Sequence, residues 1–582
     1  MPASGAPLLA VESLTVALPR GGDRAHAVEN LSFELRAGEI LCIVGESGSG
    51  KSVSANAIMG LLPAALRATS GRIVFRGRDL LGLTEPELLA LRGRDIGMVF
   101  QEPMSALNPL MNVGDQIAEV MQVHRAHPGA AREARVLELL ARVGLPDPAQ
   151  LRHAYPFRLS GGQRQRVMIA MALALEPAML IADEPTTALD VTTQAQILAL
   201  IRQLQASMGM GVMFITHDFG VVADIADRVA VMEKGVLVEQ GPRAQVLDAP
   251  RHPYTQRLIA AVPRRRDRGE PVPSGEPVPS REPVPSGVST PSGASSPSRA
   301  SVPSPSSAIP PSTAPLLEVR GLTKTFTTAR GLFTPRRVVH AVRDVSFDVD
   351  HGETLGVVGE SGSGKSTLGR CLLRLASIDA GRVLFRGHDL VGLAGARLRA
   401  ERKHLQMIFQ DPFASLNPRH TVGRIVTDGP IAHGASRAQA DAKARELLRL
   451  VELDPSAFDR YPNEFSGGQR QRIGIARALA LEPRLLVADE SVSALDVSVQ
   501  AQVLELLVGL QRRLDLGMIF ITHDLRVAAQ ICHRILVMHQ GQVVEEGAPV
   551  QIFERPRAEY TRRLIDAIPG QAWLPLGERP SP

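Results

Sequence analysis

Two short segments of the chain carry the residue types that hold a nucleotide phosphate. Gly45–Ser52 reads GESGSGKS and Gly359–Thr367 reads GESGSGKST, so both match G-x-x-x-x-G-K-[ST]. Glycines here let successive backbone N–H groups curl around phosphate oxygens, and the start of the following helix adds partial positive charge. The lysine is expected on the β/γ-phosphates and the serine hydroxyl on Mg²⁺. The predicted nucleotide ligands are Gly45, Ser47, Gly48, Gly50, Lys51, Ser52 and Val53, and Gly359, Ser361, Gly362, Gly364, Lys365, Ser366 and Thr367.

Acidic pairs end two continuous apolar runs further along the chain. Asp183-Glu184 and Asp489-Glu490 both occur in an Ala-Asp-Glu sequence. The end of a buried parallel strand is where ligands approach an open α/β sheet. We expect Asp183 and Asp489 to hold Mg²⁺ through water, and Glu184 and Glu490 to act as general bases on the attacking water. The alternative is that these acids cap neighbouring helices.

Two histidines follow apolar runs in the sequence FITHD. His217 comes after Val212–Thr216, and His523 comes after Met518–Thr522. A histidine in this place can be a core or capping residue. The functional interpretation, which we favour beside a phosphate loop and an acidic pair, is a contact to the γ-phosphate that orients the catalytic water.

All these features occur twice, in the same order. Ser160 and Ser466, Glu184 and Glu490, and His217 and His523 are each 306 residues apart (466 minus 160, 490 minus 184, 523 minus 217). A unit of this length is far longer than a solenoid repeat. The sequence therefore predicts two tandem copies of one nucleotide-binding domain.

The elements that must position these residues can be read from the apolar pattern. Short apolar runs precede each phosphate loop, each acidic pair and each histidine, as in strands buried on both faces, and a helix is expected from Lys51 and from Lys365. Strands alternating with helices predict two α/β P-loop domains, each with a mostly parallel core sheet. The expected strands are Leu8–Val16, Ile40–Val44, Met179–Ala182 and Val212–Thr216, then Leu316–Leu322, Leu355–Val358, Leu485–Ala488 and Met518–Thr522.

Composition shifts abruptly after Pro263. The next fifty or so residues contain GEPVPS twice, REPVPS once and a Ser/Pro/Ala tract, with few large apolar side chains and many prolines. Such a segment favours a disordered linker over a packed domain. The expected organisation is a first domain at 1–262, a linker at 263–315, a second domain at 316–570 and a disordered tail at 571–582.

Bulk composition excludes several classes of protein. The net charge is +5, and aromatic residues make up 4% of the chain, which disfavours nucleic-acid binding. Three widely spaced cysteines cannot form a local zinc or iron–sulfur site, and no signal peptide or membrane span is visible. From these features we expect a cytoplasmic protein, and if it serves a membrane process another chain must supply the channel.

LSGGQRQR and FSGGQRQR complete a set of motifs that closely resembles the ATP-binding cassette (ABC) ATPases. The resemblance covers nearly the whole chain outside the linker and the two ends. It implies an antiparallel β subdomain and a helical subdomain in each copy, ATP hydrolysis, and two cassettes that dimerise head to tail around two ATP molecules. The residues it adds to the two sites are Gln101, Ser160, Gly161, Gly162 and Gln163, and Gln410, Ser466, Gly467, Gly468 and Gln469.

The resemblance also assigns partners across the dimer. ATP on Lys51 would be completed by Ser466–Gly468, and ATP on Lys365 by Ser160–Gly162. The implied Mg²⁺ ligands are Ser52, Gln101 and Asp183, and Ser366, Gln410 and Asp489.

A finer resemblance is to the oligopeptide/dipeptide importer subfamily. It rests on the segments FQEPMSALNP, FQDPFASLNPR and HPYTQRL. In such importers two ATPase chains usually occur, one with GKSV and one with GKST, and this chain contains one of each. The implied partners are two transmembrane permease subunits and, indirectly, an extracytoplasmic solute-binding protein, with no nucleic acid. The cargo stays open among dipeptides, oligopeptides, glutathione, nickel chelates and opines. The competing interpretations are an exporter ATPase and a soluble tandem ABC protein that acts on ribosomes or DNA.

The first copy departs from the family pattern at two places. The family often stacks adenine on an aromatic upstream of the phosphate loop; Phe326 fits in the second copy, but the matching position in the first is Leu18. Val53 also lacks the hydroxyl of Thr367. We therefore predict weaker nucleotide binding at the first loop.

Overall fold

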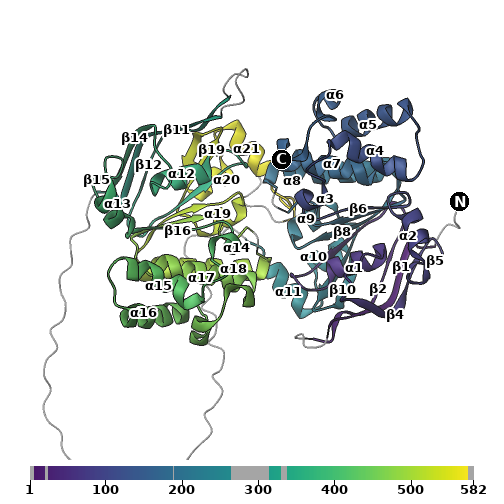
Figure 1. The fold of residues 1–582 in the computed structure, drawn as a ribbon, viewed down its shortest axis with the longest axis horizontal. Helices are drawn as coiled ribbons and strands as arrows, with labels where there is room; N and C mark the ends of the chain where they lie inside the picture. Colours follow the sequence, from purple (N-terminus) through teal and green to yellow (C-terminus); the bar gives the residue numbers. More distant parts are fainter. Residues whose placement is uncertain are drawn as a thin grey trace, which may run out of the picture.

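The computed structural model describes residues 6–19, 24–187, 189–263, 314–328, 337–493 and 495–573. The linker expected between the repeats falls almost wholly at 264–313, outside these residues. The two repeats form two domains that lie side by side, the first (purple to blue) at right and the second (green to yellow) at left in Figure 1.

The first domain is built from two sheets and their covering helices. One sheet has the strand order β10-β9-β3-β8-β7-β6, parallel except at β10, and the other has the antiparallel order β2-β1-β4-β5. Its elements are β1 (Leu9–Ala17), β2 (His26–Leu35), β3 (Ile40–Val44), α1 (Lys51–Met59), β4 (Arg67–Phe75), β5 (Arg78–Asp79), α2 (Glu85–Leu91), β6 (Ile96–Val99), α3 (Pro103–Ala106), α4 (Val113–Val123), α5 (Ala130–Arg142), α6 (Pro148–Leu151), α7 (Gly161–Ala172), β7 (Met179–Asp183), α8 (Val191–Met208), β8 (Gly211–Thr216), α9 (Phe219–Ile225), β9 (Arg228–Glu233), β10 (Val236–Pro242), α10 (Arg243–Asp248) and α11 (Pro253–Ala260).

The second domain repeats this plan. Its core sheet has the order β16-β17-β18-β13-β19-β20, and its antiparallel sheet has the order β12-β11-β14-β15. Its elements are β11 (Leu317–Thr328), β12 (Arg337–Val349), β13 (Thr354–Val358), α12 (Lys365–Leu372), β14 (Ala380–Phe385), β15 (His388–Asp389), α13 (Gly395–Arg402), β16 (Leu405–Ile408), α14 (Pro412–Ser415), α15 (Val422–Ala432), α16 (Arg437–Leu450), α17 (Gly467–Leu479), β17 (Leu485–Asp489), α18 (Val497–Leu514), β18 (Gly517–Ile521), α19 (Leu525–Ile531), β19 (Arg534–His539), β20 (Gln542–Gly547), α20 (Pro549–Glu554) and α21 (Glu559–Asp566).

The core strands are buried along their full length, as their continuous apolar runs predict. Every residue of β3, β7 and β8 is buried, and so is every residue of β13, β17 and β18. Each core sheet therefore has apolar clusters on both faces, with the helices of the helical subdomain on one and the antiparallel sheet on the other. The α/β fold with parallel core, antiparallel β subdomain and helical subdomain is confirmed in both copies.

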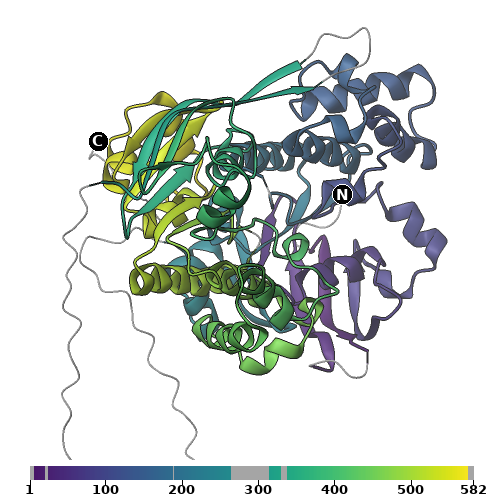
Figure 2. The same cartoon turned by 60° about the vertical axis from the view of Figure 1, so that its left-hand side comes forward.

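Each domain reaches the other through its C-terminal helix. Helix α11 of the first domain contacts α18 of the second, and α21 of the second contacts α8 of the first. In the turned view of Figure 2 the second domain's helices come in front of the first domain. The contact is reciprocal, as in a pair related by approximate two-fold symmetry.

The end of the described chain, Pro569–Trp573, is packed against the first domain, and we call it the tail. Gly570 donates its backbone N–H to Asp224 Oδ2 at 2.9 Å, and Trp573 donates Nε1–H to Asp248 Oδ1 at 3.1 Å. A Cβ on Gly220 would lie 2.6 Å from the Pro569 carbonyl oxygen, so the two backbones meet where a side chain cannot fit. The described residues thus include Gln571–Trp573, which lie beyond the predicted end of the second domain.

Candidate ATP sites

Both phosphate loops follow a buried core strand and open a helix. Gly50 and Gly364, the helix N-caps, have φ of 99° and 103°, and a Cβ there would lie within 2.7 Å and 2.1 Å of a backbone oxygen. Glycine is the residue that fits this backbone. The next backbone N–H groups and the helix N-terminus together form an anion-binding site in each domain.

The loop lysines are buried and point back into their own loops. Lys51 Nζ donates to the Gly45 and Glu46 carbonyls at 2.6 and 2.8 Å, and Lys365 Nζ donates to the two corresponding carbonyls at 2.7 and 2.8 Å. Burial lowers the pKa of both ammonium groups, although neighbouring carboxylates act in the opposite direction. Each lysine is therefore a partly desolvated cation placed for a phosphate.

The serine that ends each loop motif contacts the aspartate at the end of a core strand. Ser52 Oγ lies 3.0 Å from Asp183 Oδ1, and Ser366 Oγ lies 2.8 Å from Asp489 Oδ1. Burial raises the pKa of both carboxyls, and the serine hydrogen bond opposes that rise. A hydroxyl and a carboxylate together fit Mg²⁺, which takes one or two protein oxygens and the rest from phosphate and water.

The glutamate after each aspartate has an unusual backbone. Glu184 and Glu490 both have φ of 43°, in the left-handed region that non-glycine residues rarely adopt. Such conformations occur preferentially at functional sites, where surrounding contacts hold them. Here the conformation points each carboxylate toward the glutamine that was predicted at the site: Gln101 Nε2 donates to Glu184 at 2.9 Å, and Gln410 Nε2 donates to Glu490 at 2.7 Å.

The predicted histidines complete these clusters. His217 Nδ1 lies 3.4 Å from Glu184 Oε1, and His523 Nδ1 lies 3.6 Å from Glu490 Oε2. Burial would raise the pKa of both glutamates, but the histidine hydrogen bond and charge bring it below the usual range. The glutamates are thus ionised at neutral pH, as a general base requires.

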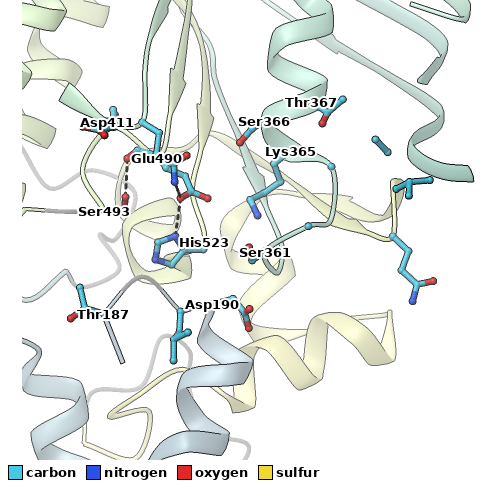
Figure 3. Close-up of a pocket in the computed structure, with 18 of the residues that line it drawn as sticks. Thr187, Asp190, Ser361, Lys365, Ser366, Thr367, Asp411, Glu490, Ser493 and His523 are labelled. Carbon is cyan, nitrogen blue, oxygen red and sulfur yellow. Dashed lines mark hydrogen bonds and ion pairs between the residues drawn. The ribbon is translucent and has the colours of Figure 1, made fainter. Parts of the chain in front are cut away.

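An open cavity of about 1150 Å³ surrounds the second phosphate loop. Figure 3 shows Lys365, Ser366 and Thr367 on one side, Glu490 and His523 on another, and Asp190 from the first domain facing them. Phe326 also lines the cavity and is 46% exposed, as a ring available for stacking on a base would be. The second site thus lies between the two domains.

The first phosphate loop is contacted directly by the second domain. Ser47 donates its N–H to Asp496 Oδ1 at 2.8 Å, and the Ser498 hydroxyl donates to Glu46 Oε1. Asp496 and Ser498 come from the start of α18, and motif reading did not assign them a place at the site. The signal that could have found them is the repeated ALDV sequence, since Asp190 holds the matching place opposite the second loop.

The SGGQ segments have the local structure of helix starts. Ser160 Oγ accepts from the Gln163 N–H at 3.2 Å, and Ser466 Oγ accepts from the Gln469 N–H at 3.4 Å, each within a capping box. A Cβ on the second glycine of either segment would lie 2.4 or 2.3 Å from a side chain of α8 or α18. None of Ser160–Gly162 is among the described residues that line the cavity around the second phosphate loop. Completion of each ATP site by the SGGQ segment of the other domain therefore stays a prediction.

Among the described residues, no helix is long and apolar enough to cross a membrane. Paired phosphate loops, each with a strand-end aspartate, an ionised glutamate and a histidine, define the class of protein: a P-loop ATPase with two nucleotide-binding domains.

Comparison with known proteins agrees with this class. The family model for ABC transporters matches residues 28–187 and 342–493, and the model for the C-terminal region of oligopeptide/dipeptide transporters matches 238–287. The glutathione import ATP-binding proteins GsiA of Salmonella paratyphi A and Escherichia coli O157:H7 are each 48% identical over 97% of this chain and 89% of their own. That of Pectobacterium atrosepticum is 47% identical over 96% and 89%. The chain belongs to the ABC transporter family and is an ATP-binding, ATP-hydrolysing member of it.

Proposed function

We propose that this chain is the complete energy-coupling unit of a peptide importer, with both ATPase domains in one polypeptide. The observation that carries the proposal is that both sites have every predicted hydrolytic group in place: lysine, serine–aspartate pair, glutamate, glutamine and histidine. The match to an oligopeptide/dipeptide C-terminal region points to import rather than export.

The chain's own residues account for each part of hydrolysis. Backbone N–H groups of each loop bind the phosphates, and the loop lysine neutralises their charge. Glu184 and Glu490 accept the proton of the attacking water, while the neighbouring histidines orient that water against the γ-phosphate. Mg²⁺, held by the serine–aspartate pairs and by Gln101 and Gln410, would stabilise charge that develops on the phosphate oxygens.

Pairing within one chain is the second part of the proposal. ATP draws each SGGQ segment toward the opposed loop, Ser466–Gly468 toward Lys51 and Ser160–Gly162 toward Lys365. The bonds from Ser47 and Glu46 to the start of α18 favour this arrangement, because they already bring the second domain to the first loop. Hydrolysis then returns the domains to the open state, a ligand-dependent shift between two conformations.

A groove of about 420 Å³ lies beside Gln410, between β16 and helices α14, α15 and α17. Its lining includes Phe409, Leu375 and Arg477. Because Phe409 precedes the glutamine that bonds to Glu490, a partner seated in this groove would sense the state of the ATP site. We propose that a cytoplasmic segment of one of two permeases occupies the groove and that the chain works at the cytoplasmic face of the inner membrane.

Glutathione is the first cargo to test, with other short peptides next, because the relatives named above are glutathione import proteins. Cargo is selected by a solute-binding protein and permeases, so the ATPase domains limit the choice of substrate only through the permeases they fit.

The proposal is tested by purifying the tagged full chain from membranes in mild detergent and identifying its partners by mass spectrometry. We expect two polytopic permeases, and we expect Leu375→Asp in the groove to lose them. The matched control is Val550→Asp, since Val550 is 48% exposed, close to the 52% of Leu375, but lies outside the groove. Recovery of ribosomal proteins, or of no membrane protein, would contradict the proposal.

A further inference from the structure

The C-terminal extension of each domain, which we define by its last helix, α11 or α21, brings a buried tyrosine to that domain's own phosphate loop. Tyr254 lies in α11 and Tyr560 lies in α21, at corresponding places of the repeat, and they are 4% and 7% exposed. Their hydroxyls reach Glu46 and Glu360, the second residues of the loops, which lie 208 and 200 positions earlier in the chain. Nothing in the motif set assigns these tyrosines a part in nucleotide binding.

Each hydroxyl holds one end of a particular peptide group. The Glu46 N–H donates to Tyr254 Oη at 3.3 Å, and the Glu360 N–H donates to Tyr560 Oη at 3.1 Å. The carbonyl of the same peptide group, on Gly45 or Gly359, accepts from the loop lysine at 2.6 or 2.7 Å. The peptide is therefore fixed from both sides, by a phenol at its N–H and by the phosphate-binding ammonium at its carbonyl.

This peptide is a point where the loop needs an external support. Gly45 and Gly359 have φ of 153° and 148°, and a Cβ at either would lie 2.2 Å from a backbone oxygen of the next strand. Glycine has no side chain to hold its backbone, and it loses more conformational freedom than other residues when it is fixed. A hydrogen bond at the adjacent N–H therefore sets the orientation from which the phosphate-binding turn begins.

The phenols are suited to this task because they stay protonated and their rings are held in place. Burial raises the pKa of Tyr560 to about 12 and raises that of Tyr254 as well. The Tyr560 ring stacks on His539 with centroids 4.0 Å apart. Tyr254 Oη also donates to Glu46 Oε2 at 3.2 Å, and the other oxygen of that carboxylate accepts from Ser498 of the second domain.

We propose that Tyr254 and Tyr560 are positioning residues of the two ATP sites, which preorganise the phosphate loops by fixing the Gly45–Glu46 and Gly359–Glu360 peptides. The C-terminal extension of each domain would then be a structural part of that domain's nucleotide site. At the first site the same tyrosine connects the loop to α18 of the second domain, which α11 also touches.

The test is the double variant Tyr254→Phe/Tyr560→Phe of the full chain, which removes both hydroxyls and keeps both rings. ATP hydrolysis is measured against ATP concentration, together with the ADP dissociation constant and the thermal midpoint. Loss of the hydrogen bond that supports the loop N–H at each site predicts that KM and the ADP constant rise about three- to ten-fold. We expect kcat to stay within about two-fold, because loop preorganisation contributes equally to ground and transition states.

The matched control is Tyr155→Phe/Tyr461→Phe, the chain's two other tyrosines, which also occupy corresponding places of the repeat. It should leave KM and the ADP constant unchanged. A lower thermal midpoint with unchanged KM and ADP constant in the test variant would show that the tyrosines merely anchor the extension, and would overturn the proposal. A fall in kcat at constant KM would overturn it as well, since the hydroxyls would then act on the chemical step. All three readouts need neither permease nor cargo, so they do not depend on the importer function.

Discussion

Replacing both strand-end glutamates by glutamine tests their assignment as general bases. In the structure each carboxylate accepts a hydrogen bond from a glutamine amide, at 2.9 Å for Glu184 and 2.7 Å for Glu490. The amide oxygen of a new glutamine can accept the same bond, and its shape matches the carboxylate. Glu184→Gln/Glu490→Gln therefore removes the proton acceptor while the position of the side chain is kept.

The expected loss follows from what the variant keeps. Both lysines, both serine–aspartate pairs and both histidines remain, so phosphate binding and charge stabilisation are retained. A positioned general base contributes about 10²–10⁴-fold to the rate. We expect kcat to fall by that factor, with the ATP dissociation constant within about three-fold of the parent because no phosphate ligand is changed.

The assay is steady-state ATP hydrolysis by the purified chain, with equilibrium binding of ATP measured in parallel. The control is Glu176→Gln/Glu482→Gln, since these exposed glutamates also have positive φ, at 54° and 52°, and also lie 306 residues apart (482 minus 176). It should hydrolyse ATP at the parent rate. Unchanged turnover in the Glu184/Glu490 variant would refute the role of both residues, and loss of ATP binding would show that they hold the nucleotide.

Three further predictions concern single features. The lowered pKa of Glu184 stabilises the folded state fully above about pH 4.3, and this stabilisation is lost as pH falls through the folded-state pKa. Burial lowers the pKa of His217, but its bond to Glu184 raises that pKa overall. The stabilisation from His217 is therefore complete below about pH 6.5 and is lost as pH rises through the folded-state pKa. The pair should therefore raise the thermal unfolding midpoint most between about pH 4.3 and about pH 6.5. The check is to measure the midpoints of the parent and of His217→Gln across a pH series, where the difference should be largest in that range. Phe326→Leu should weaken ATP binding at the second site by about 1–3 kcal/mol, measured by titration. Gly220→Ala should displace the tail, and acrylamide should then quench Trp573, the chain's single tryptophan, more strongly.

Matched substitutions separate these effects from general damage. Gly82→Ala introduces a methyl group where nothing lies within 4 Å, so quenching of the tryptophan should not change. Leu18→Phe supplies the first site with a ring and should strengthen binding there if stacking is the cause of the difference. A His217→Gln midpoint that follows the parent at every pH would contradict the ion-pair prediction.

The parts of the fold that depend on local sequence could be predicted. Apolar runs predicted three of the six core-sheet strands in each domain, β3, β7 and β8 and then β13, β17 and β18, because a strand buried on both faces admits few polar side chains. The hydrogen bond between Ser52 and Asp183 agrees with their expected proximity, since the motif sets the first residue and a strand end sets the second. The same reasoning applies to Ser366 and Asp489 in the second repeat.

Contacts between segments that lie far apart in the sequence could not be predicted in the same way. Asp496 and Tyr254 approach the first phosphate loop from segments about 450 and 210 residues away, and no periodic pattern encodes that approach. The contacts of the tail were not predicted either, because Gln571–Trp573 were assigned to a disordered end of the chain. Trp573 is held by a particular acceptor on the first domain, which only the packed structure reveals.

The close contact between Gly220 and the tail requires different residues in the two domains at this position. The residue that corresponds to Gly220 in the second domain is Arg526, whose guanidinium donates to the Pro569 carbonyl at 3.0 Å. A homodimer of the second half would place an arginine where the first domain leaves no room for a methyl group, and a homodimer of the first half would lack the tail sequence altogether. The two halves are therefore not interchangeable at this contact, and the chain pairs two different ATPase domains rather than two copies of one.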